Sequence, residues 1–188
     1  MPKPFSPAFP IRTARLILRP FTHDDLEGLH AIRSLPEVAR YVPWEPGDLE
    51  KTAKALEARI GQTTLTEENQ PLTVAVEVAG TGELIGDAML FWVSEQHRCG
   101  EVGYVFHPAH HGRGYATETV MALLELGFDG LGLRRIIGRL DTRNEASARV
   151  LERVGMRREA HLVENELFKG EWTDEFVYAI LRREWESR

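Results

Sequence analysis

Residues 106–118 read FHPAHHGRGYATE and join an alternating segment to one with helical spacing. Gly112 and Gly114 remove two β-carbons where the chain turns into the helix, so a ligand can approach the backbone N–H groups closely. The first N–H groups of a helix have no partner within it, and the helix dipole favours an anion there. The turn therefore predicts a phosphate-binding site, although a plain strand-to-helix turn is an open alternative for these residues taken alone.

The spacing of the turn argues against two common nucleotide-binding motifs. A Walker loop ends in Lys-Ser/Thr, and no such pair follows Gly114. A dinucleotide-binding fingerprint has a third glycine in the first strand–helix unit, whereas here Thr117 holds that position in the middle of the chain.

Hydrophobic periodicity on both sides of the turn predicts one mixed α/β domain, residues 1–188, with residues 1–10 as an extended N-terminal arm. Alternating segments predict seven strands, at residues 15–19, 72–78, 83–93, 98–107, 134–140, 156–168 and 173–181. Segments with helical spacing predict helices after Thr22 to about residue 33, from Pro36 to about Tyr41, and over residues 48–60, 113–128 and 145–154. Thr22 and Asn144 are expected as N-caps, and Gly155 as the residue that ends the last helix.

Composition narrows the class of protein. The 188-residue chain has a net charge of −6 and a pI of about 5.7, which disfavours nucleic acid as a partner. Cys99 is the single cysteine, so a disulfide framework is excluded. No apolar stretch is long enough to span a bilayer, and the N-terminus lacks the apolar core of a signal peptide, so we expect a cytoplasmic protein and no membrane partner.

Several motifs occur in the order that is typical of one enzyme superfamily. Residues 111–116, HGRGYA, resemble motif A of the GNAT N-acetyltransferases, Gln/Arg-x-x-Gly-x-Gly/Ala. Residues 144–156, NEASARVLERVGM, resemble the Asn-x-x-Ser/Ala…Gly-Phe helix of that superfamily. Residues 12–20, RTARLILRP, and the tail from Glu159 resemble its Rim-type branch, which includes acetylases of ribosomal-protein N-termini. Two positions depart from the pattern: His111 replaces Gln or Arg, and Leu151 replaces a tyrosine that protonates the leaving thiolate in many members.

The resemblance implies a GNAT-type α/β (α+β) domain, with a mixed, mostly antiparallel sheet of about seven strands flanked by helices. It implies acetyl-CoA as the co-substrate and a primary amine as the acceptor, either a protein N-terminus or a small molecule, with direct transfer in a ternary complex. A homodimer is possible in the resembling branch. Two other readings stay open: a non-catalytic acyl-CoA sensor on the same fold, and a nucleotide-binding module.

Acetyl transfer to an amine needs a base for the ammonium proton, a donor for the oxyanion and a proton or dipole for the thiolate. The resemblance places the base at Glu101 and the oxyanion donor at the backbone N–H of Val105. Glu166 is the rival base. Ser147 lies one helical turn before Leu151 and is our candidate acid, with helix packing as the alternative.

Cofactor contacts are expected from the glycine-rich turn, from the end of the strand before it and from the second motif helix. The predicted residues are Val105, His107, His111, Gly112, Arg113, Gly114, Tyr115, Ala116, Thr117, Asn144, Ser147 and Arg149. Arg149 can equally be a solvated helix arginine, and Asn144 can combine cofactor binding with its N-cap role. His107, His110 and His111 cluster in the sequence, but no fourth ligand of fitting spacing is apparent, so we expect no metal. Trp44 either lines the acceptor pocket or packs in the core and so anchors its proline-rich loop.

Overall fold

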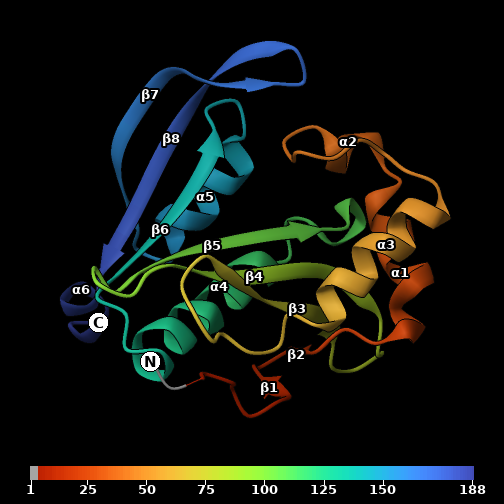
Figure 1. The fold of residues 1–188 in the computed structure, drawn as a ribbon, viewed down its shortest axis with the longest axis horizontal. Helices are drawn as coiled ribbons and strands as arrows, with labels where there is room; N and C mark the ends of the chain where they lie inside the picture. Colours follow the sequence, from red (N-terminus) through yellow and green to blue (C-terminus); the bar gives the residue numbers. More distant parts are fainter. Residues whose placement is uncertain (1–3) are drawn as a thin grey trace.

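The fold is built on one mixed sheet, and the computed structural model describes residues 4–188 of the chain. The strands lie in the order β1-β2-β3-β4-β5-β6-β8-β7 (Figure 1). They are β1 Ile11–Arg12, β2 Leu16–Arg19, β3 Gln70–Val78, β4 Leu84–Ser94, β5 Cys99–Phe106, β6 Arg135–Asp141, β7 Arg157–Phe168 and β8 Glu171–Leu181. The predicted α/β class is confirmed. The sheet has eight strands instead of seven because Ile11 and Arg12, directly after the predicted N-terminal arm, pair with β2 as β1.

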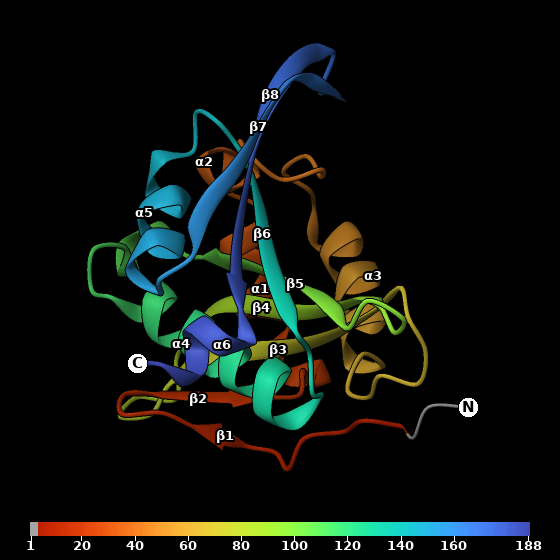
Figure 2. The same cartoon turned by 90° about the vertical axis from the view of Figure 1, so that its left-hand side faces the viewer.

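Helices cover both faces of the sheet, as expected from strands that alternate between two buried faces. On one face, Val120 and Leu123 of α4 pack against Leu72 and Val74 of β3 in the main core. On the other face, Leu29 of α1 and Leu56 of α3 enclose Ala75 and Phe21. Figures 1 and 2 show these two layers, with the hairpin of β7 and β8 projecting beyond them. The helices are α1 Leu26–Arg33, α2 Pro36–Ala39, α3 Leu49–Ile60, α4 Tyr115–Glu125, α5 Glu145–Arg153 and α6 Arg182–Glu186.

The strands β5 and β6 pair in parallel and only briefly. Their register joins Cys99 with Arg135 and Glu101 with Ile137, and no pairing continues beyond that point. β5 continues to Phe106 beside β4, whereas β6 continues to Asp141 beside β8. The two halves of the sheet therefore diverge after Glu101, and Figure 1 shows β6, β8 and β7 turning away from β5.

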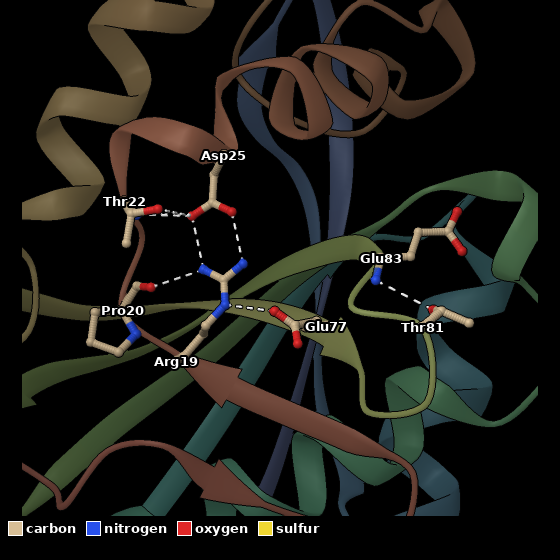
Figure 3. A network of polar contacts seen from close by, with 7 residues as sticks. All are labelled: Arg19, Pro20, Thr22, Asp25, Glu77, Thr81 and Glu83. Carbon is tan, nitrogen blue, oxygen red and sulfur yellow. Dashed lines mark hydrogen bonds and ion pairs between the residues drawn. The ribbon is translucent and has the colours of Figure 1, made fainter.

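A polar network fixes the connection from β2 to α1 (Figure 3). The Arg19 guanidinium donates to both carboxylate oxygens of Asp25, at 2.9 and 2.8 Å, and to Glu77 at 2.7 Å. Thr22 holds the predicted N-cap position, where its N–H donates to the Asp25 carboxylate at 2.8 Å and its hydroxyl donates to the same carboxylate at 3.3 Å. The chain enters α1 through a 3-10 turn at His23–Asp25.

Two helix ends show how glycine sets the boundaries. Gly155 ends α5 with φ +76°, as predicted for a left-handed residue after a helix. The helix predicted over residues 113–128 is shorter, because Gly114 has φ +80° and α4 starts at Tyr115. At its other end α4 widens into a π-turn, Leu126–Gly130.

Candidate active site

The glycine-rich turn presents a row of free backbone amides. Gly112 and Gly114 have φ +75° and +80°, which a residue with a β-carbon adopts only at a cost. The first hydrogen bond back into the turn runs from the Glu118 N–H to the Gly114 carbonyl, at 3.0 Å. Within residues 4–188, the amides of residues 112–117 donate to no backbone or side-chain acceptor. The predicted cradle is thus unfilled by the protein and can accept an anion.

Arg15 stabilises this turn through side-chain contacts that the sequence did not reveal. Its Nη1 donates to the Arg113 carbonyl at 2.9 Å, and its Nε and backbone N–H donate to Glu118, each at 2.8 Å. The guanidinium also lies 4.8 Å from the centre of the Tyr115 ring. Arg15 precedes β2, almost a hundred residues from the turn, so only the fold brings the two together.

The backbone of β5 has two edges, and the ladder with β4 decides which amides each edge carries. The His107 N–H donates to the Ile85 carbonyl at 2.8 Å, and the register pairs Asp87 with Val105. In an antiparallel ladder, hydrogen-bonded pairs alternate with non-bonded ones, so every second residue counted from His107 directs its N–H at β4. The Val105 N–H is among them, so by this register it is directed at β4 and not at the opening.

The opposite edge of β5 faces the opening toward β6. By the same alternation, this edge carries the amides of Tyr104 and Phe106. Neither residue pairs with β6, because that pairing ends at Glu101. The amides that can bond a ligand in the opening are therefore one residue away from the predicted Val105.

Glu101 lies where the opening begins, on the same strand face as Gly103 and Val105. Burial raises the pKa of its carboxyl above the ordinary value, Arg139 opposes that rise, and Glu175 adds to it. A carboxylate with a raised pKa is a stronger base than an exposed one, which suits proton abstraction from an ammonium group.

Glu101 and the rival base, Glu166, both line a cavity of about 300 Å³. The other acidic groups at its wall have partners: Glu175 accepts two bonds from Arg139, at 2.9 and 2.7 Å. The remaining lining residues are Tyr41, Pro43, Leu140, Asp141, Phe168, Thr173 and Asp174. The wall carries more carboxylates than cations, which favours a cationic acceptor group.

A lysine links two of the segments that line the cavity. The Lys169 ammonium, in the turn between β7 and β8, donates to the carbonyls of Ala39 and Trp44 at 2.7 and 2.9 Å. It also lies 3.2 Å from the Glu45 carboxylate. The β7–β8 hairpin is thereby fastened to the loop after α2, and both together form the cavity wall.

The predicted acid, Ser147, lies near the opening on α5. The Asn144 side-chain oxygen accepts from the Ser147 N–H at 3.1 Å, which confirms the predicted N-cap. The buried Tyr104 hydroxyl donates to the Ser147 carbonyl at 3.2 Å and so links β5 to α5. Burial raises the pKa of Tyr104 to about 12. Leu151 is buried against Gly138 and contributes only packing.

Other predicted residues make local contacts. The His107 ring accepts from the Ala109 N–H at 3.1 Å, and the His111 ring lies 3.2 Å from the Phe106 carbonyl. Arg149 is exposed and pairs with Glu145 one helical turn away. Among residues 4–188, no group of three or more His, Cys, Asp or Glu side chains is arranged so that it could hold a metal ion. A larger cavity of about 590 Å³ lies along α4 beside Trp185 and contains none of the predicted site residues.

The site combines a glycine-rich anion cradle, a diverging sheet and a half-buried carboxylate, which are features that suit acyl transfer. Residues 15–157 match the family described as the acetyltransferase (GNAT) domain. The chain belongs to this family and is an acetyl-CoA-dependent acetyltransferase.

Similar proteins agree with this assignment. The chain is 35% identical to the uncharacterized N-acetyltransferase YnaD of Bacillus subtilis, over 93% of this chain and 98% of YnaD. The crystal structure of a GNAT-family acetyltransferase from Bacillus anthracis superposes with a TM-score of 0.84 at 31% identity, covering 93% of this chain and 99% of that one. The spermidine N(1)-acetyltransferase of Vibrio cholerae is 25% identical over 93% of this chain and 98% of its own length. A structure of spermidine N-acetyltransferase from that organism, in complex with CoA and spermine, has the same fold, with a TM-score of 0.77 at 24% identity over 93% of this chain and 99% of that one.

The described part of the chain contains no helix that is both long and apolar enough to cross a membrane.

Proposed function

We propose that this protein moves the acetyl group of acetyl-CoA directly onto a primary amine in a ternary complex. The observation that carries the proposal is the placement of complementary groups along β5. Unbonded amides at residues 112–117 lie beyond one end of the strand, and the half-buried carboxylate of Glu101 lies at the start of the opening. The cradle would hold the diphosphate, so that the thioester arm lies along the free edge of β5.

Each step of the reaction has a group that can perform it. Glu101 accepts a proton from the bound ammonium, directly or through water, and the neutral amine attacks the thioester carbon. The oxyanion then receives hydrogen bonds from the Tyr104 or Phe106 amides on the edge of β5. Ser147 donates to the thiolate sulfur as it leaves, and no covalent enzyme intermediate forms.

Charge in the cavity supports a cationic acceptor. Glu101 and Glu166 form no ion pair with the described residues, and together they attract an ammonium group into the opening. The resemblance to the Rim-type branch suggests a protein N-terminus, and the spermidine acetyltransferase among the relatives suggests a small polyamine.

The deciding experiment measures release of CoA thiol from acetyl-CoA in the presence of N-terminal peptides, including those of ribosomal proteins, and of small amines. Acetylation of an amine with intersecting initial-velocity lines supports direct transfer. Tight CoA binding without turnover on any acceptor would instead identify an acyl-CoA sensor. Thermal protection by ATP and none by acetyl-CoA would identify a nucleotide-binding module.

The homodimer suggested by the resemblance stays a prediction. The hairpin of β7 and β8 exposes Val163 and Leu167 of the edge strand β7 and Trp172 at the start of β8, at 69%, 59% and 63% of their surfaces. A second copy of the chain is the partner that we propose for this edge. Light scattering after size exclusion measures the mass, and a monomer at all concentrations would contradict the prediction.

A further inference from the structure

Arg139 of β6 lies between two carboxylates that belong to the neighbouring strands. Glu101 of β5 is the register partner of Ile137, which is two residues before Arg139. Glu175 of β8 is the register partner of Asp141, which is two residues after Arg139. Register partners share a sheet face, as do residues two apart on one strand, so Glu101, Arg139 and Glu175 project from the same face. All three line the cavity of about 300 Å³, and a long side chain reaches its diagonal neighbours, so Arg139 has two carboxylates to choose from.

The structure pairs Arg139 with Glu175. The Arg139 Nε and Nη2 donate to the two carboxylate oxygens of Glu175, at 2.9 and 2.7 Å. In the part of the chain that the structure describes, Glu101 forms no ion pair with Arg139. Two parallel hydrogen bonds to one carboxylate are the strongest contact that an arginine makes, so the guanidinium stays with Glu175.

The β7–β8 hairpin fixes Glu175 in this position. The side-chain amide of Asn165 donates to Glu175 at 2.9 Å, and Glu175 is only 8% exposed. Asn165 lies in a bulge, because residues 163–165 of β7 lie opposite the single residue Asp174 of β8. Within the bulge Glu164 has φ +47°, which a residue with a β-carbon rarely adopts, and its N–H donates to Asp174 at 2.9 Å. Such strain persists only where the surroundings hold it, and here it accompanies the contact to Glu175.

The pairing matters for Glu101, because a bound cation would weaken it as a base. Burial raises the pKa of Glu101, and the nearby charge of Arg139 lowers it. Direct contact with a guanidinium would lower the pKa further and would occupy the oxygens that must accept the proton. Glu175 opposes both effects, since it binds the guanidinium and its own negative charge offsets that of Arg139.

We propose that Glu175 is a positioning residue for acetyl transfer, which holds the Arg139 guanidinium away from Glu101 and so leaves Glu101 free to accept the proton of the acceptor. The inference rests on the proposed function and adds to it a residue that acts through another. The proton passes from the ammonium nitrogen to a carboxylate oxygen of Glu101, while Arg139 and Glu175 keep their charges.

The other ionisable groups around Glu101 have the same surroundings in every form that the test compares. Asp141 is bound to Arg143 at 2.6 Å, and the His161 ring lies 2.7 Å from Asp174. A difference between the forms therefore reports the Arg139–Glu175 pair. The groups at or beside the cavity are Tyr41 after α2, Cys99 of β5, Asp141 of β6, Glu166 of β7 and Asp174 of β8.

The test follows kcat/KM across the pH range, with spermidine and a dipeptide amide as acceptors. Glu175→Gln keeps the shape of the side chain and removes its charge, Arg139→Met removes the guanidinium, and a double variant combines the two. The matched control is Glu77→Gln, which breaks the Arg19–Glu77 pair outside the cavity, at 2.7 Å and of similar burial.

The single variants should shift the acid limb of the profile in opposite directions. In Glu175→Gln we expect the limb to move to lower pH, because Arg139 is released toward Glu101. We expect kcat/KM at pH 7 to fall about tenfold or more, toward the loss of about 10²–10⁴-fold that removal of a general base causes. In Arg139→Met the limb should move to higher pH, and Glu77→Gln should leave it in place.

The double variant separates positioning from a merely structural role. If Glu175 acts by restraining Arg139, removal of both should return the rate and the acid limb close to those of the wild type, a strongly non-additive result. Removing both partners of a pair also leaves no unpaired charge, so this variant should fold even where Glu175→Gln does not. A loss in the double variant as large as that in Glu175→Gln, or an acid limb that no variant moves, would overturn the inference.

A titration without turnover separates this inference from the proposed function. The carboxyl ¹³C signal of Glu101, assigned by its loss in Glu101→Gln, should titrate at lower pH in Glu175→Gln and at higher pH in Arg139→Met than in the wild type. Equal midpoints in all forms would overturn the role of Glu175 even where amines are acetylated. Failure of every form to acetylate an amine would refute the proposed function, and the midpoints would still decide whether Glu175 controls Glu101.

Discussion

Replacing Glu101 by glutamine tests the base and the acceptor together. The substitution keeps the shape of the side chain and removes its ability to accept a proton. The variant can then acetylate only the amine molecules that are already neutral in solution. A peptide N-terminus with a pKa near 8 is about 10% neutral at pH 7, whereas an alkyl amine with a pKa near 10.4 is about 0.04% neutral.

The expected loss of turnover follows from these fractions. At pH 7 we expect kcat/KM of Glu101→Gln to fall about tenfold for an N-terminal peptide and about 10³-fold for a polyamine. The second value lies within the range of about 10²–10⁴-fold found for general bases, and the first lies below it. The loss should shrink about tenfold per pH unit until the amine is neutral. In the wild type, the acid limb of the profile should lie above the ordinary pKa of a glutamate, because burial raises the pKa of Glu101.

The assay follows thiol release across the pH range, with Glu166→Gln as the matched control from the same cavity. The effect of Glu101 on the pH dependence of folding stability can also be measured. A carboxyl with a raised pKa in the folded state binds its proton more tightly there, so folding becomes less favourable as pH rises through that pKa. Glu101→Gln should therefore melt no lower than the wild type at neutral pH. A pH–rate profile identical to that of the wild type would exclude Glu101 as the base, and the full loss in Glu166→Gln would assign the role to Glu166.

Four further substitutions have defined outcomes. Gly114→Ala should lower the free energy of unfolding, measured in urea, by about 1–2 kcal/mol, because alanine is strained at the φ of +80° that Gly114 adopts. The substitution should also weaken CoA binding. An unchanged free energy of unfolding would contradict the expected strain. Arg15→Met should raise the Kd of CoA by about three- to tenfold in calorimetry, since one partly exposed hydrogen bond to the turn is lost; an unchanged Kd refutes its role. Asp25→Asn should lower the free energy of unfolding by about 3 kcal/mol at pH 7. The free energy of unfolding of this variant should also depend less on pH in the acid range than that of the wild type. Burial opposes ionisation of Asp25, but hydrogen bonds from Arg19 lower its pKa, so this stability is lost as pH falls below the ordinary value; equal acid sensitivity in both forms would contradict it. Ser147→Ala should slow thiol release with little change in CoA affinity, and wild-type turnover would end the acid assignment.

Local sequence signals predicted the elements whose chemistry is itself local. Gly112 and Gly114 were expected at a turn because glycine lacks a β-carbon, and both have positive φ values there. Asn144 was expected to cap α5 because asparagine is favoured at N-caps, and its side chain accepts from an amide three residues later. The strand alternation around Glu101 followed in the same way from the pleat of a strand.

The features that sequence reasoning missed all depend on contacts between distant segments. Arg15 reaches the glycine-rich turn across the fold, and Arg33 meets Trp44 through the packing of a loop on a helix end. Neither pair is adjacent in the chain or related by a helical repeat, so no local pattern indicates it. Lys169 fastens the hairpin to a loop 125 residues away for the same reason.

The oxyanion donor shows why a strand's side-chain pattern does not settle its backbone chemistry. Alternation tells which side chains share a face, but each residue also has an N–H directed at one of two neighbouring strands. That direction depends on which neighbour pairs where, and here the 2.8 Å bond from His107 to Ile85 sets it for the whole of β5. The Val105 amide is consequently used by the sheet, whereas those of Tyr104 and Phe106 lie at the edge where β6 has departed. The oxyanion stabilisation that we propose therefore depends on an early end to strand pairing, because any continuation of β6 beside β5 would use the same amide donors.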